Sequence, residues 1–61
     1  MDMNTHDAIM KKLLDVQENV RDFECFSKEV ADKEVSSIFK EFAEESGMQA
    51  RKLQQLIDKH K

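Results

Sequence analysis

Apolar side chains recur in alternating steps of four and three residues along almost the whole chain. A repeat of this kind places every member on one side of an α-helix, because the helix turns once every 3.6 residues. The first half of the chain therefore predicts one long helix over about residues 5–30. The repeat that predicts it consists of Ile9, Leu13, Val16, Val20, Phe23, Ser27 and Val30.

The same spacing predicts a second helix over about residues 33–60. Its repeat consists of Val35, Phe39, Phe42, Ser46, Gln49, Leu53, Leu56 and His60, and it is widened by Ile38, Ala43, Ala50 and Ile57. The composition agrees, since the 61 residues include no proline and one glycine, with 39% hydrophobic and 38% charged residues. Such a composition is typical of long amphipathic helices, so we expect an all-α fold.

Polar residues at two places can begin these helices. Asn4 or Thr5 can cap the first helix, followed by Asp7 in the first turn, where the helix dipole favours a negative charge. Asp32 is the best N-cap for the second helix, because its carboxylate can accept an amide hydrogen from residue 34 or 35. A turn at about residues 31–32 is therefore expected.

The heptad count slips between the two halves, and this slip distinguishes a hairpin from a rod. Continued past Val30, the first repeat would use Glu34 and Ser37, whereas the second half begins its repeat at Val35. Because no glycine or proline marks the junction, one continuous helix of roughly 55 residues is the alternative. The slip favours two antiparallel helices in a single domain over residues 1–61.

A two-helix hairpin cannot cover its own apolar stripe, because each helix shields only one side of the other. We expect Val20 to lie level with Ala43, and two such hairpins to pair by twofold symmetry into a homodimeric four-helix bundle. Ser46 and Gln49 are polar residues expected to face this core, where they hydrogen-bond or line a small ligand pocket. The apolar residues expected in the core or dimer interface are Ile9, Leu13, Val16, Val20, Phe23, Val30, Val35, Phe39, Phe42, Ala43, Ala50, Leu53, Leu56 and Ile57.

His6, His60 and Cys25 are the side chains that could recruit a soft or borderline metal. An antiparallel hairpin brings the two histidines to one end, near Asp2 or Asp7, so a terminal metal site is the alternative to ordinary solvated ends.

Cys25 falls on the outer side of the first helix by the heptad count. Glu24 and Glu29 lie close to it, and their negative charges disfavour the thiolate. An incidental surface thiol is therefore expected rather than a catalytic nucleophile.

Several charged residues and the glycine are expected at the helix surface. Asp7 with Lys11 and Glu24 with Lys28 have the spacing of helix-supporting ion pairs. Gly47 is expected to face outward and to weaken the second helix by about 1 kcal/mol relative to alanine. The remaining set is an acidic, solvated patch that consists of Glu41, Glu44 and Glu45.

Two segments, FECFSKEVA at residues 23–31 and IFKEFAEESGMQA at residues 38–50, together resemble a shortened helical hairpin of the ferritin-like, rubrerythrin-type superfamily. In that family each hairpin carries an inward glutamate on one helix and a Glu-x-x-His pair on the next, which together hold two irons. In this chain the three ligand positions fall on Val20, Ser46 and Gln49, so all three ligands are missing. The resemblance therefore implies the architecture of paired hairpins without the di-iron chemistry. The residues that align the chain with the family are Phe39, Ala43 and Ala50.

Charge and cysteine content limit the functions that we expect. The formal net charge is -3 and the basic residues are dispersed, so we expect neither nucleic acid nor a membrane as a partner. A single cysteine makes no internal disulfide, and the first residues lack the pattern of a signal peptide, so a cytoplasmic location is expected.

The sequence does not identify a cellular role. We expect a non-catalytic structural or interaction protein without metal, cofactor or catalytic residues. One alternative is a ferritin-like metal-binding or redox protein with an atypical site formed between chains. Another is a module that docks a helix of a different protein.

Overall fold

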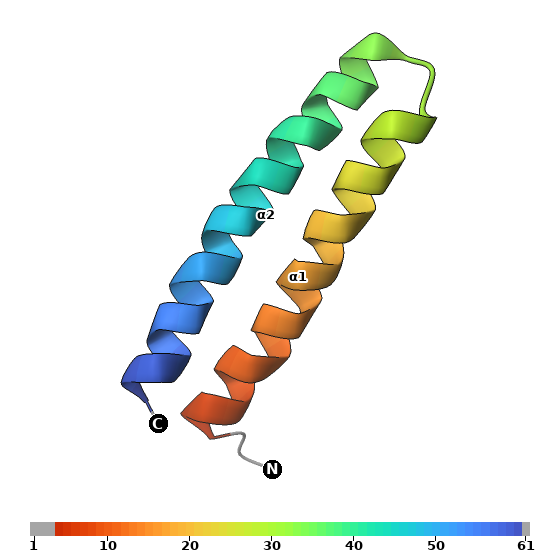
Figure 1. Cartoon of the computed structure of the whole chain (residues 1–61). Coiled ribbons are helices and arrows are strands. Elements are labelled where there is room, and N and C mark those ends of the chain that lie inside the picture. Colours follow the sequence, from red (N-terminus) through yellow and green to blue (C-terminus); the bar gives the residue numbers. More distant parts are fainter. Residues whose placement is uncertain (1–3, 61) are drawn as a thin grey trace.

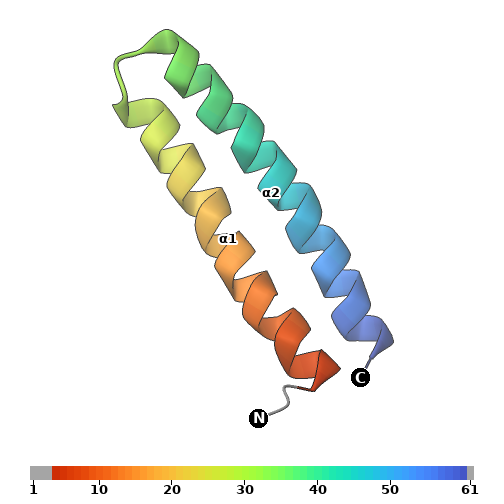
Figure 2. The same ribbon diagram turned by 180° about the vertical axis from the view of Figure 1, so that it is seen from behind.

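The computed structural model describes residues 4–60, which form two helices side by side (Figure 1). Helix α1 runs over Thr5–Glu29 and helix α2 over Lys33–Lys59, with a short connection of residues 30–32 between them. The start of α1 and the end of α2 lie at the same end of the hairpin, as the view from behind also shows (Figure 2). The predicted all-α hairpin is confirmed, and the single continuous helix is wrong.

Both helices begin at side-chain caps. The side-chain oxygen of Asn4 accepts a hydrogen bond from the backbone N–H of Asp7 at 2.8 Å, so Asn4 rather than Thr5 caps α1. The carboxylate of Asp32 accepts one from the backbone N–H of Val35 at 3.0 Å, which confirms Asp32 as the cap of α2. Each cap satisfies an amide that the helix itself leaves unpaired, and each contributes about 1 kcal/mol.

Two serines join the helices next to the connection. Ser27 is buried at 5% exposure, and its hydroxyl donates to the carbonyl of Glu24 in its own helix at 2.7 Å. The hydroxyl of Ser36 in α2 donates to the backbone carbonyl of Ser27. These bonds explain why the first repeat has a polar member at this position, because a buried polar group needs a hydrogen-bond partner.

Aromatic contacts set the same register farther from the connection. The ring of Phe23 lies 5.6 Å from that of Phe39 and 5.5 Å from that of Phe42, the latter in an edge-to-face arrangement. Such pairs contribute about 0.5–1.5 kcal/mol beyond the area that they bury. Val20 and Ala43 then line one groove between the helices, as expected for residues at the same level.

The hairpin is a single layer of helices. Its principal extents are 43 × 23 × 13 Å, and the smallest is close to the diameter of one α-helix with its side chains, about 10–12 Å. Its radius of gyration of 14.1 Å exceeds the roughly 10.5 Å of a compact chain of this length. A single layer leaves both of its broad sides open to solvent.

The core inside this layer is correspondingly small. In residues 4–60 the buried apolar side chains are Leu13, Ala43 and Ile57, and no side chain is less than 2% exposed. The rest of the predicted core is only partly covered. Its half-buried members are Ile9, Val16, Val20, Phe23, Val30, Phe39, Ala50 and Leu53, and its exposed members are Val35, Phe42 and Leu56.

Surface ion pairs differ from those that the spacing predicts. The ammonium of Lys11 lies 3.2 Å from the carboxylate of Asp15, and the ammonium of Lys12 lies 3.7 Å from the same group. Lys11 has a carboxylate four residues away on either side, Asp7 before it and Asp15 after it, and it pairs with Asp15. The predicted pairing of Lys11 with Asp7 is therefore wrong. The predicted pair of Glu24 with Lys28 is also not formed in this described part of the chain.

Neither α1 nor α2 combines the length and the apolar character that crossing a bilayer requires, within the residues that the structure describes.

Candidate protein-interaction face

Two shallow grooves follow the line where α1 meets α2, one on each broad side of the hairpin. Lys12, Val16, Gln49, Lys52 and Leu53 line the first groove. The second groove is lined by Val20, Glu24, Lys40, Ala43, Glu44, Gly47, Met48 and Arg51. In the first groove two apolar side chains and one glutamine lie between two lysines. In the second groove four charged side chains lie among apolar and small residues.

Helical spacing continues the residue rows of the first groove along the hairpin, since residues seven apart lie in one row on a helix. Lys12 and Asn19 share a row with Phe26 on α1, and Gln49 shares a row with Val35, Phe42 and Leu56 on α2. Ile38 lies one turn before Phe42, next to this row. We call this side the phenylalanine face, and its exposed members are Lys12, Asn19, Phe26, Val35, Ile38, Phe42, Gln49, Lys52 and Leu56.

The phenylalanine face holds most of the large apolar side chains that the hairpin exposes. Of the eight such side chains in the described part of the chain, five belong to it, with exposures between 37% and 45%. The contact between Phe23 and Phe42 joins the face to the line between the helices. Exposed apolar side chains that gather on one side make the phenylalanine face a candidate surface for association with another molecule.

The opposite side, which we call the charged face, is organised differently. Glu24 of α1 and Lys40, Glu44 and Arg51 of α2 surround its groove. Met48 is 60% exposed here, Met10 shares the row of Glu24, and the exposed Leu14 follows Met10 by one turn, so the apolar side chains outside the phenylalanine face are fewer than on it. Single exposed apolar residues are ordinary on protein surfaces.

Gly47 lies in the groove of the charged face. The prediction that it faces outward is wrong, because Gly47 is half-buried one turn after the buried Ala43. A Cβ atom built at this position meets nothing within 4 Å, so no close contact within the hairpin requires glycine.

The two polar core candidates occupy different environments. Ser46 is buried at 7% exposure, whereas Gln49 is exposed on the phenylalanine face beside Val16 and Leu53. In the single hairpin the Gln49 amide is therefore in contact with solvent. Only a molecule docked on this face would enclose it.

The three positions at which the resemblance to the rubrerythrin-type hairpin places iron ligands do not lie together. Val20 lines the groove of the charged face, Gln49 lines the groove of the phenylalanine face, and Ser46 is buried between the helices.

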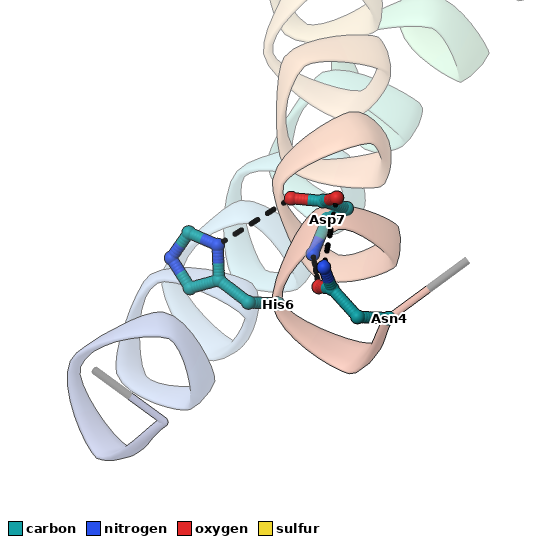
Figure 3. A network of polar contacts seen from close by, with 3 residues as sticks. All are labelled: Asn4, His6 and Asp7. Atoms are coloured by element: carbon teal, nitrogen blue, oxygen red, sulfur yellow. Dashed lines mark hydrogen bonds and ion pairs between the residues drawn. The ribbon is translucent and has the colours of Figure 1, made fainter. Parts of the chain in front are cut away.

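Figure 3 shows the polar side chains at the start of α1, where a terminal metal site was the alternative. Nδ1 of His6 lies 3.9 Å from a carboxylate oxygen of Asp7, and the other oxygen accepts a hydrogen bond from the side-chain amide of Asn4 at 3.0 Å. Within residues 4–60 no group of three or more His, Cys, Asp or Glu side chains is placed to hold a metal ion. Asp2, the other acid named for this site, lies outside the described residues.

Cys25 is exposed on the outer side of α1, as predicted. The negative charge of the Glu29 carboxylate is the main cause that raises the pKa of its thiol, and a small desolvation adds to it. The thiol also donates a hydrogen bond to that carboxylate at 3.7 Å, and Asp22 raises the pKa further against the opposing charge of Lys28. Because the reactive form is the thiolate, this environment makes Cys25 a poor nucleophile.

Comparison of the chain with protein families, with curated proteins and with solved structures gives no match. Its function is therefore argued from its own residues. The 4-3 repeat missed Lys12, Asn19 and Lys52 as members of the phenylalanine face. The signal that could have found them is a spacing of seven or fourteen residues, which separates the first two from Phe26 and the third from Ile38.

Proposed function

We propose that the protein is a non-catalytic structural or interaction protein that self-associates, with two hairpins burying their phenylalanine faces against each other in a four-helix bundle. The exposed aromatic and aliphatic row on one side only of a one-layer hairpin carries this proposal. Stable domains consist of at least two packed layers around a common core. A second hairpin supplies the second layer.

The surface area of the chain agrees with a partner of this size. The hairpin exposes 5028 Å², whereas a compact monomer of 7.2 kDa exposes about 4100 Å². The excess of roughly 900 Å² is close to the 800 Å² or so that each partner buries in an interface of standard size.

The proposed bundle also gives the half-buried residues a complete environment. Four half-buried side chains lie at the line between the helices, next to the phenylalanine face, so a second hairpin covers their remaining exposed area. They are Phe23, Phe39, Val16 and Leu53. Because these side chains are already half-buried, covering the rest of each contributes only a part of the about 1.5–3 kcal/mol that full burial of a large apolar side chain provides. The proposal includes the reducing cytoplasm as location, since a chain with one cysteine has no internal disulfide to maintain.

The test is native mass spectrometry of the protein purified without added metal or chelator, combined with thermal melting followed by circular dichroism at several concentrations. We expect a bare species of twice the 7.2 kDa chain mass and a Tm that rises with concentration, because association stabilises only the folded state. Circular dichroism suits a chain without Trp or Tyr.

Two outcomes would contradict the proposal. A monomer whose Tm does not depend on concentration would exclude self-association and favour docking onto a helix of a different protein. A dimer that retains a metal ion would contradict the non-catalytic role and favour the alternative of a ferritin-like site formed between chains.

A further inference from the structure

We infer that the second copy lies on the phenylalanine face in the opposite direction, so that the two connections stand at opposite ends of the bundle. This inference rests on the proposed self-association and adds its geometry. The distribution of charge along the face carries it.

Basic and acidic side chains border the phenylalanine face at different levels. Lys12 and Lys52 line the same groove, so they lie at one level along the hairpin. This level is in the half that holds the start of α1 and the end of α2, away from the connection. Lys12 and Lys11 share the carboxylate of Asp15, so these three side chains carry one net positive charge, to which Lys52 adds a second.

Acidic residues border the other half of the face. Glu45 stands in one row with Lys52 and Ile38 on α2, one heptad nearer to the connection than Lys52. On α1 the edge beside the face is the row of Asp15, Asp22 and Glu29, and Asp22 lies next to Phe23, whose ring contacts those of Phe39 and Phe42. The lysines that border the face therefore lie in the half near the start of α1 and the end of α2, where Asp15 is paired with two of them, and the half near the connection is bordered by acids.

A second copy that points in the same direction meets like charges. In that arrangement α1 of one hairpin lies against α2 of the other at equal levels, with a twofold axis along the bundle. Lys12 would then face Lys52 of the second copy, and Asp22 would face the level of Glu41 and Glu45. Like charges placed across an interface act against association.

A second copy that points in the opposite direction meets complementary charges. Each α2 then runs antiparallel to the α2 of the other copy, which brings Lys52 to Glu45 of the second copy and Lys12 towards Asp22. Every such contact occurs twice because of the twofold axis. A border that is basic at one end and acidic at the other is complementary to itself, which favours a copy of this chain over an unrelated protein as the occupant.

The two sets of charges place the twofold axis consistently. The midpoint between Lys12 and Asp22 is residue 17 on α1, and the midpoint between Glu45 and Lys52 falls between residues 48 and 49 on α2. Residue 17 lies near the level of residue 46, so the two midpoints differ by only about 4 Å along the helix axis. The axis then passes beside Gln49, whose amide meets the same amide of the second copy.

Spin labels separate the two directions. In a Cys25→Ser background, a label at Lys33→Cys marks the connection end of α2, and a label at Glu18→Cys marks the middle of α1. With opposite directions, the two labels at residue 33 in a dimer lie about 40–45 Å apart. With the same direction they lie within about 30 Å of each other. The label at residue 18 gives a dipolar signal in both arrangements.

Electron–electron double resonance on both labelled proteins distinguishes failure of the inference from failure of the proposed function. Long distances at residue 33 together with a signal at residue 18 support the inference. Short distances at residue 33 overturn it and leave self-association intact. The loss of a dipolar signal from both labels shows a monomer, which contradicts both.

A charge exchange provides an independent test. Lys52→Glu places like charges against Glu45 of the second copy twice per dimer, so we expect the Kd of the dimer to increase about tenfold at low salt. Adding Glu45→Lys to the same chain restores opposite charges and returns the Kd to within about twofold of its original value. Glu45 and Lys52 are seven residues apart on one helix, about 10 Å, so the rescue cannot come from a contact between these two positions of the same chain. A double variant that is no tighter than Lys52→Glu overturns the inference.

Discussion

The phenylalanine face and the charged face are built from the same two helices, yet only the first presents a continuous apolar surface. The buried line between the helices is shared by both faces and is narrow, with Leu13, Ala43 and Ile57 as its buried apolar members in the described part of the chain. The apolar stripe of each helix is wider than this line. Most of the surplus falls on one side, where α2 presents Phe42 within a row of exposed apolar side chains and α1 adds Phe26, while the other face carries mainly charges.

This asymmetry indicates how a two-helix chain can specify one partner surface. If the surplus of α1 and that of α2 fell on opposite sides, each face would carry a single apolar row, too narrow to cover another hairpin. Because Phe26 of α1 stands on the same side as the apolar row of α2, the apolar surface there includes both helices, and the charged face keeps the second side unsuited to further stacking. The proposed bundle therefore closes at two hairpins.

The largest effect is expected from placing a charge on each face in turn. Phe42→Glu puts a carboxylate at the centre of the phenylalanine face, and we expect the Kd of the dimer to increase at least 100-fold, since burying an unpaired charge costs several kcal/mol. Met48→Glu introduces the same group on the charged face, where it stays in solvent, and is expected to change the Kd less than threefold. Sedimentation equilibrium of the two variants measures this difference. Equal effects would remove the distinction between the faces.

An intermediate effect is expected from replacing a glutamine on each face by leucine. Gln49→Leu removes both amides that meet at the proposed twofold axis, so no unpaired partner remains, and we expect the dimer to be stabilised by about 1 kcal/mol. Gln17→Leu, in the row of Glu24 on the charged face, is expected to leave the Kd unchanged. Urea unfolding at a fixed protein concentration measures the free energy of unfolding of each variant dimer. A destabilised Gln49→Leu dimer would indicate that this amide does not face a packed core.

A smaller effect is expected at the groove of the charged face. Gly47→Ala improves helix propensity, and the added methyl group meets nothing within 4 Å, so we expect the hairpin to gain about 0.5–1 kcal/mol of stability. The Kd of the dimer is expected to stay the same. A weaker dimer would show that the charged face contacts the second hairpin.

The hairpin and its register could be predicted from the sequence because they depend on periodic and local features. The slip of the repeat between Val30 and Val35 marks the connection, and the Asp32 cap forms over three residues. The repeat could not separate residues between the helices from residues beside them, since Phe39 and Phe42 belong to one stripe although their exposures differ. That distinction depends on how the second helix is rotated, which is a tertiary property.

Surface contacts were less predictable for a similar reason. Asp7 and Asp15 stand at equal distances along the chain from Lys11, and the choice between them depends on what else each carboxylate binds. Asp7 already accepts the side-chain amide of Asn4, whereas Asp15 receives both Lys11 and Lys12.

The smallest effect is expected at Cys25, which lies on the outer side of α1 away from both faces. Glu29→Gln removes the charge that raises the pKa of the thiol most, so the pKa falls, more thiolate is present at pH 8, and alkylation by iodoacetamide becomes faster. Glu24→Gln is the matched control, because Glu24 is adjacent in sequence but is not among the groups that raise this pKa, and its alkylation rate is expected to equal that of the unaltered protein. The rate is also expected to be the same above and below the Kd of the dimer. A rate that falls as the dimer forms would place Cys25 within the interface, and the phenylalanine face would then not be the surface that the second hairpin covers.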